Sequence, residues 1–197
     1  MSRYEGVDFY NIEKHLTEEE IMVRDLVRDW VDEKVIPIIE DYYTKGTFPM
    51  ELISEIGEMG LFGCNLEGYE CAGLSHVAYG LVCQELERCD SGIRSFVSVQ
   101  GSLVMFPIFA YGSEEQKKKW LPKLASAEWI GAWGLTEHNT GSDAGAMATT
   151  AVKEGDNWVI NGTKNFITHA ISGDIAVVMA RTGEKGDSHG ISTFVIE

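Results

Sequence analysis

The sequence predicts an α+β protein, in which an all-α N-terminal domain is followed by the start of an antiparallel β-barrel or sandwich domain. Two observations carry this prediction. Apolar residues recur at helical spacing through most of the chain up to residue 129, and from Ile130 onward short apolar runs alternate with turn residues. We therefore expect a helical domain over residues 1–129 and a partial β domain over residues 130–197.

The net charge of the chain argues against two classes of binding partner. Of 197 residues, 16 are Lys or Arg and 31 are Asp or Glu, which gives a formal net charge of −15. A surface of that sign repels nucleic-acid backbones and anionic membranes, so we expect neither as a partner. The four cysteines form no C-x-x-C pair and have no histidine at ligand spacing, so we expect free thiols and no metal site; they are Cys64, Cys71, Cys83 and Cys89.

The beginning of the chain reads MSRYEGVDFYNIEKHL. It carries neither a charged and then apolar signal peptide nor an Arg-rich transit sequence. We therefore expect a cytoplasmic protein, or a protein of the mitochondrial matrix if a eukaryotic precursor has been processed.

The first helix should begin at Thr17, which forms a capping-box pattern with Glu20. Apolar residues then follow a helical period as far as Tyr42, and Pro37 should bend or split this helix because it lacks a backbone N–H. A second helix is expected from Pro49 to Gly60, followed by a glycine-rich loop over residues 61–74.

Ser75 can cap the next helix, and Asp90-Ser91-Gly92 separates it from an apolar helix that runs to about residue 111. We interpret the apolar helix as a buried core helix that falls short of a membrane span, because four residues interrupt it: Ser98, Gln100, Gly101 and Pro107. A second capping box, Ser113 with Gln116, starts the last helix. Its Lys117–Lys119 run indicates a solvated face.

The β region should begin near Ile130. A turn at Gly155-Asp156 separates two strands, Asn161-Gly162 predicts a hairpin that leads into a strand over 164–168, and residues 174–180 read as a buried strand. The final ISTFVIE also reads as a strand. The sheet therefore looks unfinished, and we expect a fragment of a longer protein.

The stretch from Trp133 to Gly145, WGLTEHNTGSDAG, is the candidate ligand loop. Small residues let the backbone approach a bound group, and hydroxyls with free N–H groups can satisfy carbonyl or phosphate oxygens. The alternative is an ordinary turn after a strand, because the same residue types favour turns. The stretch matches neither a Rossmann fingerprint nor a P-loop.

Arg94 is the candidate substrate residue, because a guanidinium at the start of an apolar helix is costly to bury without a carboxylate. A carboxylate of the protein is the simpler partner. Asp90 lies four residues earlier and Glu87 lies one turn beyond that, so spacing alone favours an ion pair with one of them.

Two motifs, LTEHNTGSDAG and WVINGTKNFIT, resemble the flavin-contacting middle domain of the acyl-CoA dehydrogenase family. Two more, ELERCDSGIRSFVSVQGSLVM and IFAYGSEEQKKKWLPKLA, resemble the N-terminal helical domain of its glutaryl-CoA dehydrogenase branch. The resemblance covers nearly the whole chain. It implies FAD-dependent α,β-dehydrogenation of an acyl-CoA thioester, most of all glutaryl-CoA, with possible decarboxylation to crotonyl-CoA.

The resemblance also assigns residues. Those implied to contact FAD are Trp133, Leu135, Thr136, Gly141, Ser142, Phe166, Ile167 and Thr168. Those implied to bind the substrate are Arg94, Ser95, Ser98 and Ser142, with Glu87 tuning the guanidinium. The catalytic glutamate of the family belongs to a C-terminal four-helix bundle that this sequence lacks, so we assign no catalytic base and expect the chain alone to be inactive or nearly so.

Two positions depart from the family pattern, since His138 stands where proline is usual and Phe166 where tryptophan is common. The resemblance further implies an electron-transferring flavoprotein as the electron acceptor and a homotetramer at full length. Alternatives stay open: a non-catalytic module that binds CoA derivatives or pairs with a complementary polypeptide, a short-chain acyl-CoA dehydrogenase, or an acyl-CoA oxidase.

Overall fold

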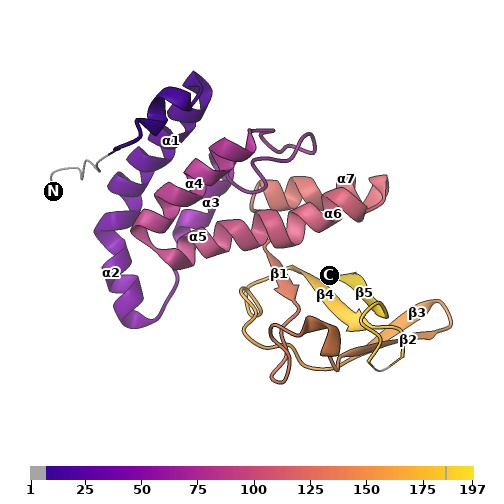
Figure 1. Cartoon of the computed structure of the whole chain (residues 1–197). Helices are drawn as coiled ribbons and strands as arrows, with labels where there is room; N and C mark the ends of the chain where they lie inside the picture. Colours follow the sequence, from indigo (N-terminus) through magenta and orange to yellow (C-terminus); the bar gives the residue numbers. More distant parts are fainter. Residues whose placement is uncertain (1–7, 185) are drawn as a thin grey trace. The chain divides into compact units, whose positions relative to one another are not determined.

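The computed structural model describes residues 8–184 and 186–197 (Figure 1). The first seven residues, on which the expectation about targeting partly rests, lie outside the described part. The chain forms two compact units. Unit 1 comprises Met1–Pro49 and Leu74–Arg94, and unit 2 comprises Met50–Gly73 and Ser95–Glu197. Each unit is described by itself.

Unit 1 starts with a short 3-10 helix, η1 (Ile12–His15), and then α1 (Glu18–Trp30), whose N-terminus carries the predicted capping box between Thr17 and Glu20. The predicted long helix is continuous, but it changes geometry before its proline. A π-helical segment, η2 (Val31–Val35), leads into α2 (Ile36–Lys45), with Pro37 in the first turn of α2. The wider π turn accommodates a residue that cannot donate a backbone hydrogen bond.

The second half of unit 1 is α4 (His76–Cys89), capped by Ser75 as predicted and packed against α1. A buried carboxylate joins the two helices. Glu85 accepts hydrogen bonds from Arg28 at 2.6 Å and from Arg88 at 3.0 Å, and Arg88 also pairs with Asp32 at 2.7 Å. The burial of Glu85 is therefore offset by two cations rather than one.

The helices of unit 2 follow the predicted order. A short 3-10 helix, η3 (Met50–Leu52), precedes α3 (Ile53–Glu58), and the loop over 61–74 follows. α5 (Ser91–Ser98) begins in unit 1 and continues into the π-helical η4 (Val99–Met105) and then α6 (Phe106–Tyr111). α7 (Glu114–Ala125) carries the predicted capping box between Ser113 and Gln116.

The helix over Ser91–Tyr111 is the core helix that its apolar character predicted. With a mean hydropathy of 1.4, however, this helix is long and apolar enough to span a membrane by length and composition alone. The prediction that Ser98, Gln100, Gly101 and Pro107 make it too short for a span was therefore wrong. One face of the helix packs inside the protein, where Ile93, Phe96, Val97, Val104, Met105 and Ile108 are buried, whereas Leu103, Phe106 and Tyr111 are exposed. Core helices share this composition, so the helix is explained by its packing.

The sheet of unit 2 has five strands: β1 (Gly131–Gly134), β2 (Thr150–Glu154), β3 (Asn157–Asn161), β4 (Ile175–Arg181) and β5 (Ile191–Ile196). The path β1-β4-β2-β3 orders four of them, and β5 also pairs with β4. The pairs β2–β3 and β4–β5 are antiparallel, as expected. β4, however, runs parallel to β1 and, at one register position, to β2, so the sheet is mixed. The long excursion between β1 and β4 returns the chain in its original direction, as a parallel pair requires.

One predicted strand is absent and one predicted turn is present. Gly155, with φ 61°, occupies the tight turn between β2 and β3 as the sequence indicated. Asn161-Gly162 makes no hairpin, and residues 164–168 form no strand. Their polar groups instead bond the segment that follows β1, which the local sequence pattern cannot reveal.

Candidate functional site

The two predicted flavin-binding motifs meet in unit 2, directly after β1. The backbone N–H of Asn165 donates a 2.8 Å hydrogen bond to the carbonyl oxygen of Thr136. This bond places the segment of Leu135 and Thr136 beside the segment that leads to Phe166, Ile167 and Thr168. The structure thus joins the two groups of residues that the sequence treated as separate motifs.

A buried ion pair lies at the same crossing, and the sequence analysis missed it. Lys164 Nζ donates to Glu137 Oε1 at 2.8 Å and to the carbonyl oxygen of Leu135 at 3.0 Å. Backbone N–H groups of Ala148 and Thr149 donate to the Glu137 carboxylate at 2.6 and 2.9 Å. The available signal was that Lys164 is the single charged residue of WVINGTKNFIT, whereas LTEHNTGSDAG offers two carboxylates, Glu137 and Asp143.

The environment of Glu137 fixes its charge. Burial raises the pKa of this carboxyl group, but the Lys164 ammonium and the hydrogen bonds from Ala148 and Thr149 outweigh that effect. Together they bring the pKa to about 2, so Glu137 is ionised at neutral pH. The pair is therefore a charged, hydrogen-bonded structure.

The segment after Lys164 has an unusual backbone. Phe166 and His169 both have positive φ, at 58° and 62°, which costs free energy for residues other than glycine. Phe166 is also 93% exposed, so burial of its ring offsets none of that cost within the described residues. Strained, exposed aromatic residues are typical of sites that contact a ligand.

His169 anchors the other end of this turn. Its ring packs edge-on against Phe96, with ring centroids 4.4 Å apart, and its Nδ1 lies 2.9 Å from Ser172 Oγ. Burial lowers the pKa of His169 below its usual value, so the imidazole is neutral near pH 7. Packing therefore holds the turn of residues 166–169 against the core helix.

The alternation of side chains sorts the sheet into two faces. On one face, Gly134 and Val178 line a cavity of about 310 Å³ together with Lys164, Ile167 and His169. Of the predicted FAD residues, Ile167 lies in this cavity. Thr136 and Thr168 are half-buried, and Thr168 lies in the chain between two lining residues, Ile167 and His169.

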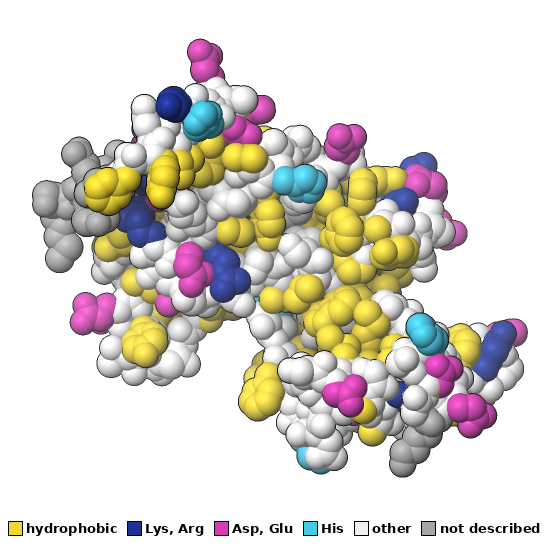
Figure 2. Space-filling model, in the orientation of Figure 1, with side chains coloured by type: hydrophobic (Ala, Val, Ile, Leu, Met, Phe, Trp, Pro, Cys, Tyr) yellow, Lys and Arg dark blue, Asp and Glu magenta, His cyan; other side chains and the backbone are white. Residues whose placement is uncertain are grey.

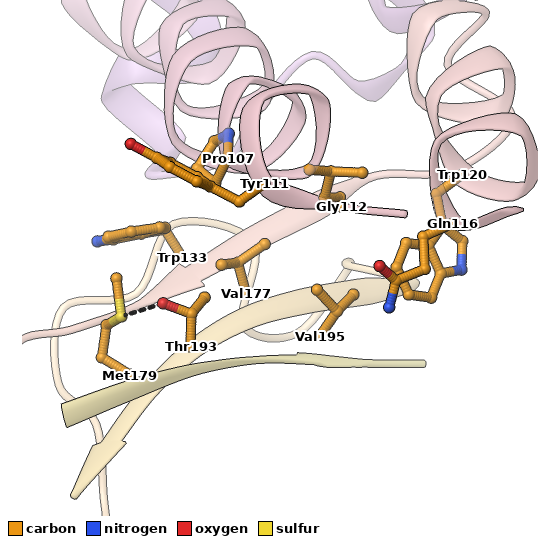
Figure 3. A pocket seen from close by; sticks show the side chains of 11 residues that line it. Pro107, Tyr111, Gly112, Gln116, Trp120, Trp133, Val177, Met179, Thr193 and Val195 are labelled. Carbon is orange, nitrogen blue, oxygen red and sulfur yellow. Dashed lines mark hydrogen bonds between the residues drawn. The ribbon is translucent and has the colours of Figure 1, made fainter. Parts of the chain in front are cut away.

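Trp133 points to the opposite face. It lines a separate cavity of about 290 Å³ with residues of α6 and α7, among them Pro107, Tyr111 and Trp120, and with Val177 and Val195 from the sheet (Figure 3). Figure 2 shows hydrophobic side chains gathered where α6 lies over β4 and β5. Two of the predicted FAD residues, Trp133 and Ile167, therefore line different cavities.

The loop that holds Gly141 and Ser142 is fastened at both ends. Glu137 and Thr140 exchange backbone hydrogen bonds of 3.0 and 3.1 Å at its start. At its end, the buried guanidinium of Arg181 donates to the carbonyl oxygens of Gly145 and Met147 at 2.5 and 3.2 Å. Gly141 and Ser142 themselves are exposed between these two anchors.

Three polar atoms near this crossing are buried without a hydrogen-bond partner among the described residues. They are Thr140 Oγ1, Thr149 Oγ1 and Asn165 Oδ1. Unpaired buried polar atoms are rare in native proteins, so their occurrence together needs an explanation. All three belong to the segments that the Asn165–Thr136 hydrogen bond and the Glu137–Lys164 pair bring together.

Arg94, the predicted substrate residue, is the last residue of the segment Leu74–Arg94 of unit 1. Of the two predicted carboxylate partners, Glu87 is the one that pairs with it, at 2.5 Å, and Ser91 Oγ donates to the same carboxylate at 2.7 Å. Asp90 instead accepts from the backbone N–H of Ile93 at 3.0 Å. Glu87 raises the pKa of Arg94, which is 35% exposed.

Ser95 and Ser98 belong to unit 2 and are half-buried on the helix that continues from Arg94. Ser98 Oγ donates to the carbonyl oxygen of Ser95 at 3.1 Å. All four cysteines are free, and no group of three or more His, Cys, Asp or Glu suited to a metal ion occurs in the part of the chain that the structure describes.

The sequence and the fold of this chain are similar to those of known proteins. The acyl-CoA dehydrogenase N-terminal domain matches residues 17–128, and the acyl-CoA dehydrogenase middle domain matches residues 132–197. A short-chain specific acyl-CoA dehydrogenase of Clostridium acetobutylicum is 40% identical over 184 residues, which are 93% of this chain and 48% of that protein.

Two solved structures of glutaryl-CoA dehydrogenase from Mycobacterium smegmatis are also similar. One is 52% identical with a TM-score of 0.89, over 94% of this chain and 47% of that chain. The other, in complex with FADH2, is 45% identical with a TM-score of 0.89, over 95% of this chain and 47% of that chain. The chain thus spans about half the length of the relatives it matches, and it belongs to the acyl-CoA dehydrogenase family.

Proposed function

We propose that this chain forms the N-terminal part of an FAD-dependent acyl-CoA dehydrogenase, with glutaryl-CoA as the favoured substrate and decarboxylation to crotonyl-CoA as a further step. Under this proposal residues 1–129 form the helical domain and residues 130–197 begin the flavin-contacting β domain. The single observation that carries the proposal is the hydrogen bond from Asn165 to Thr136, which joins the two motifs expected to hold the flavin.

The residues present fit a flavin. Phe166 offers an exposed aromatic surface on a strained backbone, and the buried oxygen atoms of Thr140, Thr149 and Asn165 have hydrogen-bonding capacity that the described residues leave unused. Half-buried Thr136 and Thr168 carry hydroxyls, which can both donate and accept. We propose that these groups, with Leu135, Gly141, Ser142 and Ile167, hold FAD; Trp133 faces the opposite side of the sheet and supports the strand from there.

The chemistry needs an acceptor for the β hydride and a base for the α proton. Protein side chains do not accept hydride, and FAD supplies that acceptor when it is bound. The residues of this chain orient the ring, exclude water from it and polarise it through hydrogen bonds from Thr136 and Thr168. No residue of this chain is assigned as the base, so we propose that the chain alone is inactive or nearly so.

The preference for glutaryl-CoA rests on Arg94. Its planar guanidinium suits the distal carboxylate of a dicarboxylic thioester, and Ser95 and Ser98 follow it on the same helix. In the structure Glu87 occupies this guanidinium, so a substrate carboxylate has to share or replace that partner. Similarity to glutaryl-CoA dehydrogenase at 52% identity supports the assignment.

A second candidate is a dehydrogenase of short-chain acyl-CoA, in which the Arg94–Glu87 pair is purely structural. The 40% identity to a short-chain specific enzyme favours this alternative over an acyl-CoA oxidase or a non-catalytic CoA-binding module. The remaining expectations form part of the same proposal: transfer of electrons to an electron-transferring flavoprotein, assembly into a homotetramer at full length, and a cytoplasmic or mitochondrial matrix location.

A titration of the purified 197-residue chain with FAD tests the proposed function. Absorbance and fluorescence should show saturable binding with a perturbed flavin spectrum, and glutaryl-CoA should perturb that spectrum more than butyryl-CoA does. Equal responses to the two thioesters would favour the short-chain alternative. An unchanged spectrum of free FAD at every protein concentration would contradict a preformed flavin site in this chain.

A further inference from the structure

We infer that Glu137 and Lys164 are a positioning pair, which fixes the distance between the two flavin-binding segments, residues 135–142 and residues 166–168. This inference rests on the function proposed above. It assigns to the pair a role in shaping the site, while the pair itself need not touch the flavin.

The contacts of Lys164 and its neighbour hold three consecutive residues in place. The ammonium group bonds the carboxylate of Glu137 at 2.8 Å and the carbonyl of Leu135 at 3.0 Å. The next residue, Asn165, bonds the carbonyl of Thr136 at 2.8 Å. Thr136 therefore cannot move relative to Phe166 unless at least one of these hydrogen bonds breaks.

The carboxylate of Glu137 extends the same constraint to a third segment. Its two oxygens accept the N–H groups of Ala148 and Thr149 at 2.6 and 2.9 Å. Those residues end the loop that carries Ser142, and Glu137 itself begins it. One carboxylate thus fixes the entry and the exit of the proposed ligand loop, as well as the crossing with Lys164.

Stability alone does not account for this pair. The side chains of Glu137 and Lys164 are only 5% and 11% exposed, and two apolar side chains in such a place would avoid the cost of removing both charges from water. Charge-assisted hydrogen bonds add direction, because they define which atoms meet and at what distance.

Direction matters at this point of the fold. Residues 164–168 lie outside the strands, so no ladder of the sheet fixes them, and Phe166 has a left-handed backbone. A strained residue persists only where its surroundings hold it, and Lys164 and Asn165 are the two residues that precede Phe166 in the chain. The pair supplies the constraint that the sheet does not provide.

Two measurements on the 197-residue chain test the inference. The first is amide hydrogen exchange without FAD at Asn165, Ala148 and Thr149. The second is a titration with FAD followed by absorbance and visible circular dichroism. The variants are Lys164→Met, which removes the ammonium group and keeps the stem, and Lys164→Arg, which keeps the charge.

The matched control is Glu85→Gln in unit 1. Glu85 is also a buried carboxylate paired with two cations, and it touches neither proposed segment. A double variant, Glu137→Gln with Lys164→Met, leaves no unpaired buried charge and serves if Lys164→Met alone does not fold.

Lys164→Met and the double variant should raise the exchange rate of Asn165 and weaken FAD binding by about tenfold to a hundredfold, the factor that one charge-assisted hydrogen bond represents. They should also change the circular dichroism of the bound flavin. Lys164→Arg keeps the charge, so its exchange rate at Asn165 and its FAD affinity should stay close to those of the wild type. Glu85→Gln should match the wild type in both measurements wherever it is folded.

Wild-type FAD affinity and spectrum in a folded Lys164→Met chain would overturn the inference, whatever its melting temperature. If the wild-type chain does not bind FAD, the proposed flavin site fails first, and the exchange data still decide on the pair. Unchanged exchange at Asn165 in Lys164→Met would then overturn the positioning role, whereas faster exchange would support it.

Discussion

The side-chain amide oxygen of Gln100 accepts a 2.7 Å hydrogen bond from the backbone N–H of Gly131, which joins the core helix of unit 2 to the first strand of the sheet. Its amide nitrogen donates to the carbonyls of Leu124 and Trp129 at 3.0 and 2.9 Å. Gln100 is fully buried. One polar side chain therefore links η4, the end of α7 and the start of β1.

Replacing Gln100 with Leu should lower the free energy of unfolding by about 2–5 kcal/mol, because it leaves a buried N–H and two carbonyls without their partner. Urea denaturation followed by far-UV circular dichroism measures the change. Gln116→Leu is the matched control, since the Gln116 side chain accepts one hydrogen bond at an exposed helix end and its loss should cost about 1 kcal/mol. Equal costs for the two variants would disprove the role given to Gln100.

Gly131→Ala should destabilise unit 2 by about 1–3 kcal/mol through overpacking. A Cβ at this position would lie 2.4 Å from Cγ1 of Val104, a buried residue of the core helix. Adding Val104→Ala should recover part of the loss, and a double-mutant cycle measures the coupling. Gly80→Ala is the control, because a Cβ there meets no atom within 4 Å and should stabilise α4.

Acid should destabilise the chain through Glu137. Its pKa is about 2 in the folded protein against a usual 4.5, so its contribution to stability is complete above pH 4.5 and is lost as the pH falls toward 2. The shift corresponds to about 3 kcal/mol. Stability curves between pH 6 and pH 3 should be flatter for Glu137→Gln, and curves parallel to those of the wild type would refute the ionised, buried state.

His169 should make the free energy of unfolding depend on pH in a second, higher range. Burial lowers its pKa below the usual 6.5, so the unfolded chain binds a proton more readily than the folded one. Stability is therefore unaffected by this residue well above pH 6.5 and decreases as the pH falls below that value. His169→Phe should remove this component between pH 7.5 and pH 5.5, whereas His189→Phe, on an exposed turn, should leave it in place.

Arg94→Met should weaken the binding of glutaryl-CoA by about tenfold to a hundredfold and leave butyryl-CoA binding unchanged, because only glutaryl-CoA has a carboxylate for the guanidinium. Calorimetric titration of the FAD-loaded chain with each thioester measures the two affinities. Arg24→Met is the control, since that arginine pairs with Glu13 and Asp25 in unit 1. Equal losses for both thioesters would assign Arg94 a structural role.

Local chemistry made the helices predictable. The capping boxes at Thr17 and Ser113 and the Ser75 cap each act within one turn, so residue types at fixed spacing reveal them. The turn at Gly155 was equally visible, because its left-handed backbone favours glycine. The family, and with it the two domain types, followed from motifs that the comparisons confirmed.

The sheet and the site depend on contacts between distant residues, and these were less visible. The parallel pairing of β1 with β4 results from where a long connection returns, which no short window contains. Asn161-Gly162 favours a hairpin locally, but Lys164 and Asn165 bond the segment of residues 135–137 and take those residues out of the sheet. The Glu137–Lys164 pair was missed for the same reason.

The two π-helical segments each contain a wider turn just before a proline, at Pro37 and at Pro107. A residue added to a helix rotates everything after it by about 100°, because each residue of an α-helix advances by that angle. The side chains of α6 are therefore rotated about the helix axis relative to the positions that a continuous α-helix from α5 would give them. Pro107 and Tyr111 lie just after the π-helical segment and line the cavity beside the sheet, so the shape of this cavity should depend on the winding of the preceding turn.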